Sequence, residues 1–451
     1  MKKRMFFWIA LFLKMQFPGF CQSTEFIDTN ALTETKIKLN GYVRGASYFG
    51  GEIYEFTNIF SEVRFNAEAR FDQGNLKADV RMRTGSEFEE RFNDFEIKEL
   101  YGSFQNERAH LSIGNQIIEW GRTDGYNPTN YLSPKNYFFL TDDMDDQLLS
   151  NFMVRLKYSI NPAIDLDFIL SPVYRPSQYR FDLIQIGQNI QFAEFAQPSL
   201  QFKNMGFACR LNADYPIAGF SISYFNGYST FHGFNNKETL FEPANGSLSI
   251  LNEPKPFRKQ AIGIDFAIPT SFMIIRGETA YNLPTDKEKG MYIPNEDIYY
   301  VMGVEKEIMG FRWILQYIGR FIPHFESLSA PNALHYDMNN PIEQIKFVLD
   351  MTDYEMSAFN RKLFGQQYEF GHAVSLFISK SFAFDLVKAE LAGMYDFQTE
   401  EWMLRPKVSW QINDRIRIGI GGCYLNGPEK SLFNYSSGIM NGLSVDFRVY
   451  F

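Results

Sequence analysis

The chain has 451 residues and a formal net charge of −9. Its 44 basic residues are scattered rather than clustered and are outnumbered by acidic residues, which argues against nucleic-acid binding. Aromatic residues make up 17% of the chain, yet no segment offers the roughly 20 consecutive apolar residues of a membrane-spanning helix. The mean hydropathy of −0.26 does not exclude a membrane protein built from strands, because such strands are apolar only at alternate positions.

The N-terminus has the order typical of a secretory signal peptide. Three basic residues (2–4) precede a short apolar run (5–13), and the small residues Gly19 and Cys21 favour cleavage after Cys21. Lipidation of Cys21 is an alternative, although Phe20 before it fits a lipobox poorly. With no linker or composition shift further along, we expect a signal peptide at 1–21, a periplasmic N-terminal segment at 22–35 and one barrel domain at 36–451.

A hairpin over residues 59–84 is the clearest element in the first hundred residues. Apolar and charged side chains alternate along 59–72 and again along 76–84, so each strand has one apolar and one charged face. Asp72–Asn75 contains the Gly and Asn that a tight turn requires. Each strand is about as long as the ~9–11 residues that cross a bilayer at a tilt.

The same rule predicts eighteen strands along the chain. We place them at 36–49, 59–72, 75–85, 95–105, 109–120, 150–159, 164–173, 199–213, 217–229, 258–268, 272–283, 297–307, 311–322, 366–380, 384–397, 402–412, 415–425 and 440–451.

The connections between these strands alternate in length. Tight turns such as Asp72–Asn75 follow every second strand, whereas the other connections are generally longer and include 121–149, 174–198, 230–257 and 323–365. In soluble sandwiches and propellers nothing requires all the short turns to lie at one end. Outer-membrane barrels, in contrast, have short turns at the periplasmic end and longer loops at the extracellular end. We therefore predict an all-β fold, a transmembrane antiparallel up-and-down β-barrel of 16–18 strands, most consistent with 18, with short periplasmic turns and long extracellular loops.

Strand phase also separates the cysteines. Cys209 shares its face with Phe207 and should point to lipid, whereas Cys423 shares its face with Arg417 and should point to the lumen. A disulfide between them is therefore not expected.

Charged side chains on the predicted inner face are candidates for lining a pore. They could tune ion selectivity, or they could pair with one another and stiffen the wall, which their interleaved signs favour. The candidates are Arg44, Glu62, Arg64, Glu68, Arg70, Asp79, Arg81, Arg83 and Arg155.

The most distinctive local stretch is 114–128, which contains a Trp-Gly pair and an Asn-Pro pair. Gly121 and Gly125 permit a sharp exit from the preceding strand, and Pro128 fixes the return of the chain. The loop could fold into the lumen as a constriction, or it could cap the rim with its charges paired to one another. The constriction candidates are Arg122, Asp124 and Asn127.

Four acidic residues crowd the end of this loop: Asp142, Asp143, Asp145 and Asp146. They lack the spaced glycine and terminal Glu of an EF-hand, so a solvated acidic loop is favoured over a calcium site. We expect no metal site and no cofactor.

Two long loops contain helical patterns. Asn340-Pro341 is a typical helix start, and apolar residues recur at helical spacing up to Leu363. This helix could plug the mouth, although an outer helix packed on neighbouring loops is favoured. Residues 182–196 are a weaker second candidate.

The C-terminal segment alternates strictly and ends in an aromatic residue, which resembles the assembly signal of Gram-negative outer-membrane barrels. The residues of this predicted membrane-assembly signal are Leu443, Val445, Phe447, Val449 and Phe451.

Together with the stretch 114–128 and the Lys98–Tyr101 strand before it, this signal makes the chain resemble porin-like barrels of unassigned function. The resemblance covers the whole chain at the level of architecture and implies the outer membrane as the location.

Catalysis is not expected. The five histidines include no close pair at metal-ligand spacing, and neither a Gly-x-Ser-x-Gly elbow nor a phosphate loop is present.

We therefore predict a porin-like channel for small polar or charged solutes, with outer-membrane lipids and the barrel-assembly machinery as partners and homo-oligomerisation as an option. The alternative is a plugged barrel that acts as a receptor or adhesin, or the outer component of a lipid or polysaccharide export system.

Overall fold

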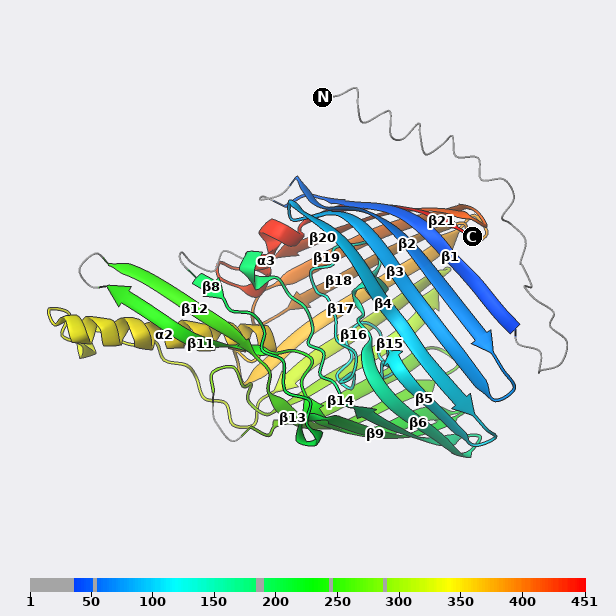
Figure 1. The fold of residues 1–451 in the computed structure, drawn as a ribbon, viewed down its shortest axis with the longest axis horizontal. Coiled ribbons are helices and arrows are strands. Elements are labelled where there is room, and N and C mark those ends of the chain that lie inside the picture. Colours follow the sequence, from blue (N-terminus) through cyan, green and yellow to red (C-terminus); the bar gives the residue numbers. More distant parts are fainter. Residues whose placement is uncertain (1–35, 52–54, 184–189, 243–245, 287–289) are drawn as a thin grey trace, which may run out of the picture.

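In a computed structural model, the chain forms a closed barrel of eighteen strands (Figure 1). The structure describes residues 36–51, 55–183, 190–242, 246–286 and 290–451. The predicted signal peptide and periplasmic segment lie outside the described residues. None of the helices in the described ranges has both the length and the apolar character needed to cross a membrane.

A strand is present at each of the eighteen predicted places, and each pairs antiparallel with its neighbours; the one predicted at 199–213 begins only at Gly206, because Phe202–Asn204 form a 3-10 turn. The first and last strands close the barrel, from Tyr42 opposite Tyr450 to Phe49 opposite Leu443. The wall consists of Lys36–Phe49 (β1), Phe56–Arg70 (β2), Gly74–Glu87 (β3), Glu90–Gln105 (β4), Ala109–Gln116 (β5), Asn151–Asn161 (β6), Ile164–Ser171 (β7), Gly206–Tyr215 (β9), Ala218–Tyr228 (β10), Arg258–Pro269 (β13), Ile274–Pro284 (β14), Asp297–Ile308 (β15), Phe311–Phe321 (β16), Phe370–Phe382 (β17), Val387–Asp396 (β18), Trp402–Asn413 (β19), Ile416–Asn426 (β20) and Gly442–Tyr450 (β21).

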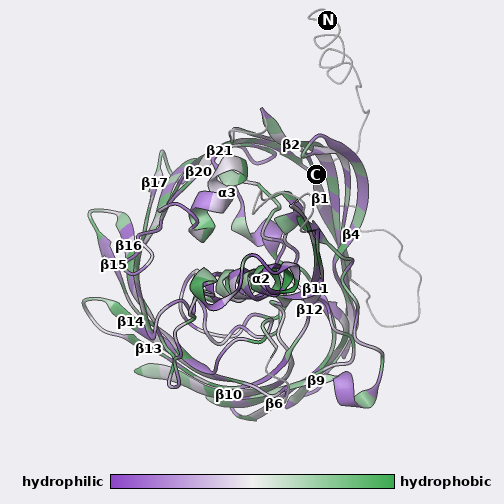
Figure 2. Cartoon of the chain, turned by 90° about the vertical axis from the view of Figure 1, so that its left-hand side faces the viewer, coloured by the Kyte–Doolittle hydropathy of each residue, from purple (hydrophilic) through white to green (hydrophobic). Residues whose placement is uncertain are grey.

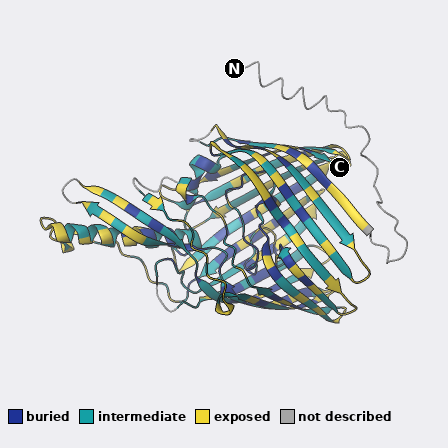
Figure 3. Cartoon of the chain, viewed as in Figure 1, coloured by how far each residue is buried: buried dark blue, intermediate teal, exposed yellow. Residues whose placement is uncertain are grey.

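The burial pattern is the reverse of that in a soluble protein. In β21, Leu443, Val445 and Phe447 are exposed on the outer face, whereas the intervening Asp446 and Arg448 are buried inside. The same alternation of exposed and buried positions runs along most strands (Figure 3). An apolar outer face and a charged inner face are expected of a barrel whose outer surface contacts the hydrocarbon core of a membrane.

The cysteines follow the same rule. Cys209 and Cys423 are both free, and Cys423 packs against a cluster of buried side chains inside the barrel.

Elements beyond the wall gather at the end opposite the tight turns. They are the strands Ile190–Phe192 (β8), Gly233–Glu242 (β11) and Ser247–Lys255 (β12), which form a separate small sheet, and the helices Pro341–Phe364 (α2) and Leu432–Met440 (α3). Viewed along the barrel axis, α2, β11 and β12 project over the middle of the ring (Figure 2). The hairpin β11–β12 was not predicted from the sequence.

The predicted helix start at Asn340-Pro341 is confirmed. The Asn340 side chain accepts a hydrogen bond from the backbone N–H of Ile342, and Gly365 ends the helix in the left-handed conformation. Its inner end packs on a neighbouring loop as favoured, because the Asn360 amide bonds both backbone groups of Phe234 at 2.7–2.8 Å.

Two other predictions need correction. The described parts of 182–196 contain a 3-10 turn at Phe181–Leu183 and the strand β8, with no helix between 190 and 196. β5 ends at Gln116 rather than at residue 120, because the backbone of Ile118 bonds the Ser133 side chain at 2.8 Å instead of a neighbouring strand.

Candidate functional site

The connection between β5 and β6, residues 117–150, is called the inner loop because it contacts the inner face of the wall on opposite sides. Near its start it bonds Glu278 on β14 and reaches Arg312 on β16. Near its end it bonds Arg44 on β1 and Lys407 on β19. A loop that touches these strands crosses the lumen.

A tight turn at the start of the inner loop directs the chain inward. Gly121 and Gly125 have φ angles of +109° and +81°, as their place in the sequence predicted. A Cβ on Gly121 would overlap the side chains of Asn127 and Glu278. The Asn127 amide donates to the carbonyl of Trp120, so this predicted constriction residue closes the turn.

The carboxylate of Glu278 holds this turn against the wall. It accepts hydrogen bonds from the backbone N–H groups of Arg122, Thr123 (2.5 Å) and Thr129 (3.4 Å), and from both threonine hydroxyls at 2.8 and 3.1 Å. Its residue is only 3% exposed. Sequence reasoning missed Glu278, because a single inward Glu on a strand gives no sign of a partner 150 residues away.

The two charged constriction candidates pair with the wall and not with each other. The Arg122 guanidinium lies 2.7 Å from Asp265 on β13. Asp124 pairs with Arg276 on β14 and lies 3.9 Å from Arg312. Glu278 and Asp265 on the wall, with the loop groups that they bind, are called the acidic anchor.

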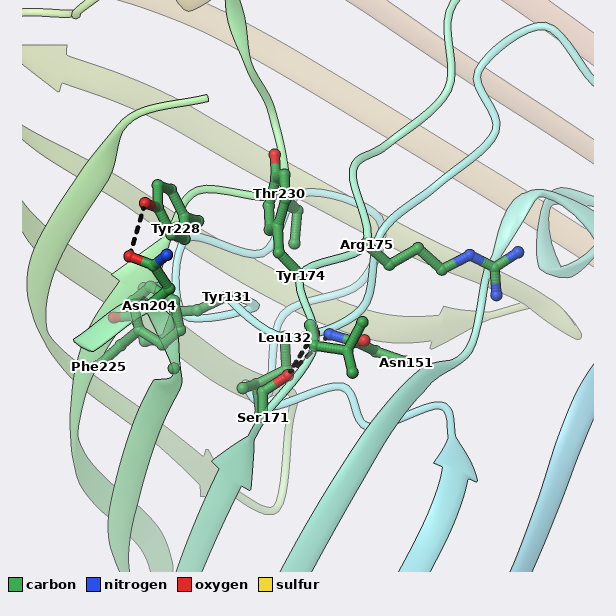
Figure 4. Close-up of a pocket in the computed structure, with 12 residues that line it drawn as sticks. Tyr131, Leu132, Asn151, Ser171, Tyr174, Arg175, Asn204, Phe225, Tyr228 and Thr230 are labelled. Carbon is green, nitrogen blue, oxygen red and sulfur yellow. Dashed lines mark hydrogen bonds between the residues drawn. The ribbon is translucent and has the colours of Figure 1, made fainter. Parts of the chain in front are cut away.

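Apolar side chains fill the space between the inner loop and the nearby wall. Trp120, Tyr131 and Leu132 pack against buried residues of the neighbouring strands, among them Ala208 and Ala261, whose small size leaves room for the rings. The Tyr131 ring also stacks on Phe225, with centroids 5.5 Å apart. What remains beside them is a cavity of about 30 Å³, enough for about one water molecule (Figure 4).

The acidic end of the inner loop is buried among arginines. Asp146 lies 2.7 Å from Arg44, 2.8 Å from Arg81 and 4.0 Å from Arg448, and its side chain is 5% exposed. Asp142 lies 3.5 Å from Arg44 and is equally buried. These three arginines, with the carboxylates that they bind, are called the basic anchor.

The prediction of a solvated acidic loop is therefore wrong. Asp142 and Asp143 also pair with Lys407 (3.5 Å) and Arg448 (3.3 Å), so only Asp145 of the four lacks an ion pair within the described residues. The described residues contain no group of three or more side chains arranged to hold a metal ion.

The basic anchor also sets the ionisation of Asp146. Burial raises the pKa of this carboxyl, but the charges of Arg44, Arg81 and Arg448 lower it more, so the pKa lies well below its ordinary value of 3.8. Lys98 completes the contact, since its ammonium donates to the carbonyls of Asp146 (3.0 Å) and Leu148.

The nine pore-lining candidates all take part in ion pairs. Arg44 and Arg81 bind the inner loop and approach Glu62, and the other pairs join wall residues to one another: Arg64–Asp79 (2.5 Å), Arg70–Glu68 (2.8 Å), Arg83–Asp94 (2.6 Å) and Arg155–Asp167 (2.7 Å). This arrangement matches the wall-stiffening interpretation of these charges.

Arg405 on β19 differs from them. Its guanidinium reaches the inner loop through the carbonyl of Thr141 (3.4 Å) and the sulfur of Met144. Within the described residues no carboxylate lies within ion-pair distance of it, and it is partly exposed. It is a cation beside the inner loop whose charge is not neutralised by a direct partner.

Above the inner loop, the long connections meet in an apolar cluster, called the mouth cluster. Its buried members come from strand ends, loops and both helices: Tyr48, Phe88, Phe138, Leu140, Phe181, Phe234, Met356, Phe359 and Ile439. The mouth of the barrel is therefore narrowed by packed side chains as well as by backbone.

Known structures share this architecture. No family model matches the sequence, and no curated protein matches it. OccK5 (OpdH) of Pseudomonas aeruginosa superimposes with a TM-score of 0.52 at 9% identity, over 92% of this chain and 97% of that one. OccAB3 of Acinetobacter baumannii gives 0.52 at 9% over 92% and 98%, and OccK3 (OpdO) of P. aeruginosa gives 0.52 at 8% over 92% and 95%. These neighbours are Gram-negative outer-membrane porins, and the chain has their fold, that of an outer-membrane β-barrel.

Proposed function

We propose that the protein is an outer-membrane channel for small polar or charged solutes, in which the inner loop narrows the lumen. The observation that carries the proposal is the attachment of one loop to opposite sides of the inner wall. A loop held in this way reduces the open cross-section without closing the barrel by itself. The role is passage of solutes rather than catalysis.

The charges divide into two groups with different roles. Those of the basic anchor are paired and buried, so they hold the loop and add little to the field that a passing ion meets. Arg405 lies beside the loop without a carboxylate partner among the described residues, so it contributes a net positive charge there. Because an unpaired cation at a narrow point favours anions, the channel should prefer anionic solutes.

The candidate residues fit this division. Arg122, Asp124 and Asn127 fix the first half of the inner loop, and Arg44 and Arg81 fix the second half. Their proposed role is to set the width of the passage.

The second candidate function is a plugged barrel that binds a ligand or partner at the surface. The mouth cluster favours it, because aromatic and aliphatic side chains from many connections pack together across the extracellular end. In that case the lumen would conduct poorly, and the projecting α2 and β11–β12 would be the functional surface.

Single-channel recording of the refolded mature protein in a planar bilayer with a KCl gradient tests the proposal. We expect ohmic steps and a reversal potential of the sign that indicates anion preference. Arg405→Glu should shift that potential towards cation preference. Arg415→Glu, which makes the same charge change in an exposed tight turn at the opposite end, should leave it unchanged.

One result would overturn the proposed channel, and another would overturn only the role of Arg405. A folded, heat-modifiable barrel that shows no conductance steps would favour the plugged barrel. An unchanged reversal potential in the Arg405 variant would remove its assigned role in selectivity while leaving the channel in place.

A further inference from the structure

One part of the β7–β9 connection leaves the mouth and lies on the outside of the barrel. The turn Phe202–Asn204 (η3) directly precedes β9 and lies outside the ring of strands, next to β9 in Figure 2. Leu200 and Phe202 in this segment are 77% and 85% exposed, well above most lipid-facing residues of the strands. Large apolar groups exposed in this way mark a surface that meets another apolar phase.

Behind this turn is a cleft with a volume of about 630 Å³. This volume lies in the range of small-ligand sites. The lining combines aromatic rings, charges and neutral polar groups: Ala196, Pro198, Ser199, Asn204, Tyr228, Glu253, Pro254, Lys255, Pro256, Asp286 and Tyr292.

Strand register places the cleft on the outer side of the wall. Tyr228 at the end of β10 is opposite Arg258 at the start of β13, and both share the strand face of the exposed Ile222 and Ile264. The Tyr228 hydroxyl donates to the Asn204 side chain at 3.2 Å, which ties the wall to η3. The cleft therefore lies at the extracellular rim, directly above the lipid-facing surface.

Lys255 lines the cleft, and two further cations lie close to it, Lys203 on η3 and Arg258 beside the lining residue Tyr228. Lys255 lies over the Tyr292 ring at 4.6 Å, and Lys203 ends the exposed turn; neither has a carboxylate within ion-pair distance among the described residues. Arg258 stacks on Tyr228 at 5.1 Å, and its Nη1 is buried with no hydrogen-bond partner among the described residues.

The cleft also offers acceptors and a flat ring. Within the described part of the chain, Glu253 receives one long bond, from Asn235 (3.4 Å), and Asp286 receives one from the backbone N–H of Arg258 (3.1 Å). Free carboxylate oxygens beside a tyrosine ring suit hydroxyl-rich groups such as sugars, whereas the lysines and the arginine suit phosphate.

From these three features we propose that the outer wall between η3 and the ends of β10 and β12 binds a phosphorylated glycolipid of the outer leaflet. Leu200 and Phe202 contact its acyl chains, Lys203, Lys255 and Arg258 face its phosphate, and Glu253 and Asp286 accept from its sugar hydroxyls. The inference rests on the membrane location of the barrel and holds whether or not the lumen conducts.

Native mass spectrometry of the refolded barrel in detergent, titrated with bisphosphorylated lipid A, tests this assignment. We expect one lipid per barrel, and at least tenfold weaker binding of the same lipid after enzymatic or chemical removal of its phosphates. That first comparison uses the wild-type protein only, so it does not depend on the folding of a variant.

Variants then locate the site. The double change Lys203→Ala and Lys255→Ala should weaken binding of lipid A about tenfold and abolish the preference for phosphorylated lipid. Leu200→Ser with Phe202→Ser should weaken both lipids alike. Lys346→Ala on α2, which alters an exposed lysine that also lies over a tyrosine ring, and Leu334→Ser, which alters an exposed leucine of another connection, should change neither.

Equal binding of the phosphorylated and dephosphorylated lipids by the wild-type protein would overturn the assignment of the headgroup. Equal binding of lipid A by the wild-type protein and by both cleft variants, each confirmed as folded by heat modifiability, would overturn the site.

Discussion

The two anchors of the inner loop do the same task with opposite charges. At the acidic anchor the wall supplies carboxylates and the loop supplies an arginine and N–H groups; at the basic anchor the wall supplies arginines and the loop supplies carboxylates. Their cations differ in exposure to solvent, because the side chains of Arg44 and Arg81 are fully buried whereas that of Arg122 is 18% exposed. Asp124 lies beside the acidic anchor without belonging to it, and its side chain is 46% exposed.

This difference determines what each ion pair contributes. A buried charge depends on its partner, because removal of one member leaves the other desolvated and unpaired. An exposed pair loses little when it is broken, because water replaces the partner. We therefore expect residues 142–146 of the inner loop, which the basic anchor binds, to be held much more strongly than Asp124.

The largest effect is expected from Asp146→Ala. This change leaves Arg44, Arg81 and Arg448 close together without their central carboxylate, and the cost should be about 3–5 kcal/mol. Urea unfolding in detergent should show the loss, and single-channel recordings should show larger, noisier conductance. Asp145→Ala, at an exposed neighbour with no ion pair in the described residues, should behave like the wild type; equal effects of the two changes would contradict the comparison.

The same carboxylate predicts a dependence on pH. Since the pKa of Asp146 is lower in the folded protein than in the unfolded chain, its contribution is fully present above the ordinary pKa of 3.8 and is lost as the pH falls through the lower folded value. Other carboxylates titrate in this range, so the measurement is the difference in unfolding free energy between the wild type and Asp146→Asn from pH 7 downwards. That difference should shrink only below about pH 4; a difference that stays constant to strongly acidic pH would contradict the assignment.

Glu278→Gln should have an intermediate effect. The neutral amide keeps the shape but weakens the charge-assisted bonds from Arg122, Thr123 and Thr129, for a loss of about 1.5–3 kcal/mol. Conductance should become noisier while the basic anchor stays intact. Glu307→Gln, a change at an exposed residue on β15, serves as the control. A Glu278→Gln variant with the stability and conductance of the wild type would show that the apolar packing of Trp120 and Tyr131 is enough to hold the turn.

The smallest effect is expected from Asp124→Asn. Its pairs with Arg276 and Arg312 are partly exposed, so the change should cost at most about 1 kcal/mol. Because the lost charge lies inside the barrel, ion selectivity at low salt should shift towards anions more clearly than stability falls. A loss of stability comparable with that of Asp146→Ala would reverse the ranking of the two ends of the loop.

The sequence allowed prediction of the wall but not of what lies inside it. Strand alternation is local and has a period of two, so all eighteen strands could be placed, including the weakly patterned β7. The turn glycines Gly121 and Gly125 and the helix start at Asn340 could also be predicted, because the backbone conformation there depends on the residue itself.

The anchors could not be placed in the same way. Asp146 is separated in the sequence from Arg81 by 65 residues and from Arg44 by 102. A pattern within one segment cannot predict contacts between residues so far apart. A signal was nevertheless present: four acids near the end of one long loop face a wall whose β1, β3 and β21 carry inward arginines. The inward arginines of the wall and the acidic residues of the loop have opposite charges. Taken together, they favour burial of these carboxylates against the wall over their exposure to solvent.

The position of the closing seam gives the basic anchor a further consequence. Arg44 belongs to the first strand, whereas its partner Asp446 and the neighbouring Arg448 belong to the last. The full set of arginines around Asp146 is therefore assembled only after β1 and β21 have paired, so complete docking of residues 142–146 should come late in folding. A barrel whose seam is still open would already hold the start of the inner loop at the acidic anchor on β13 and β14, and closure of the seam would then fix its end.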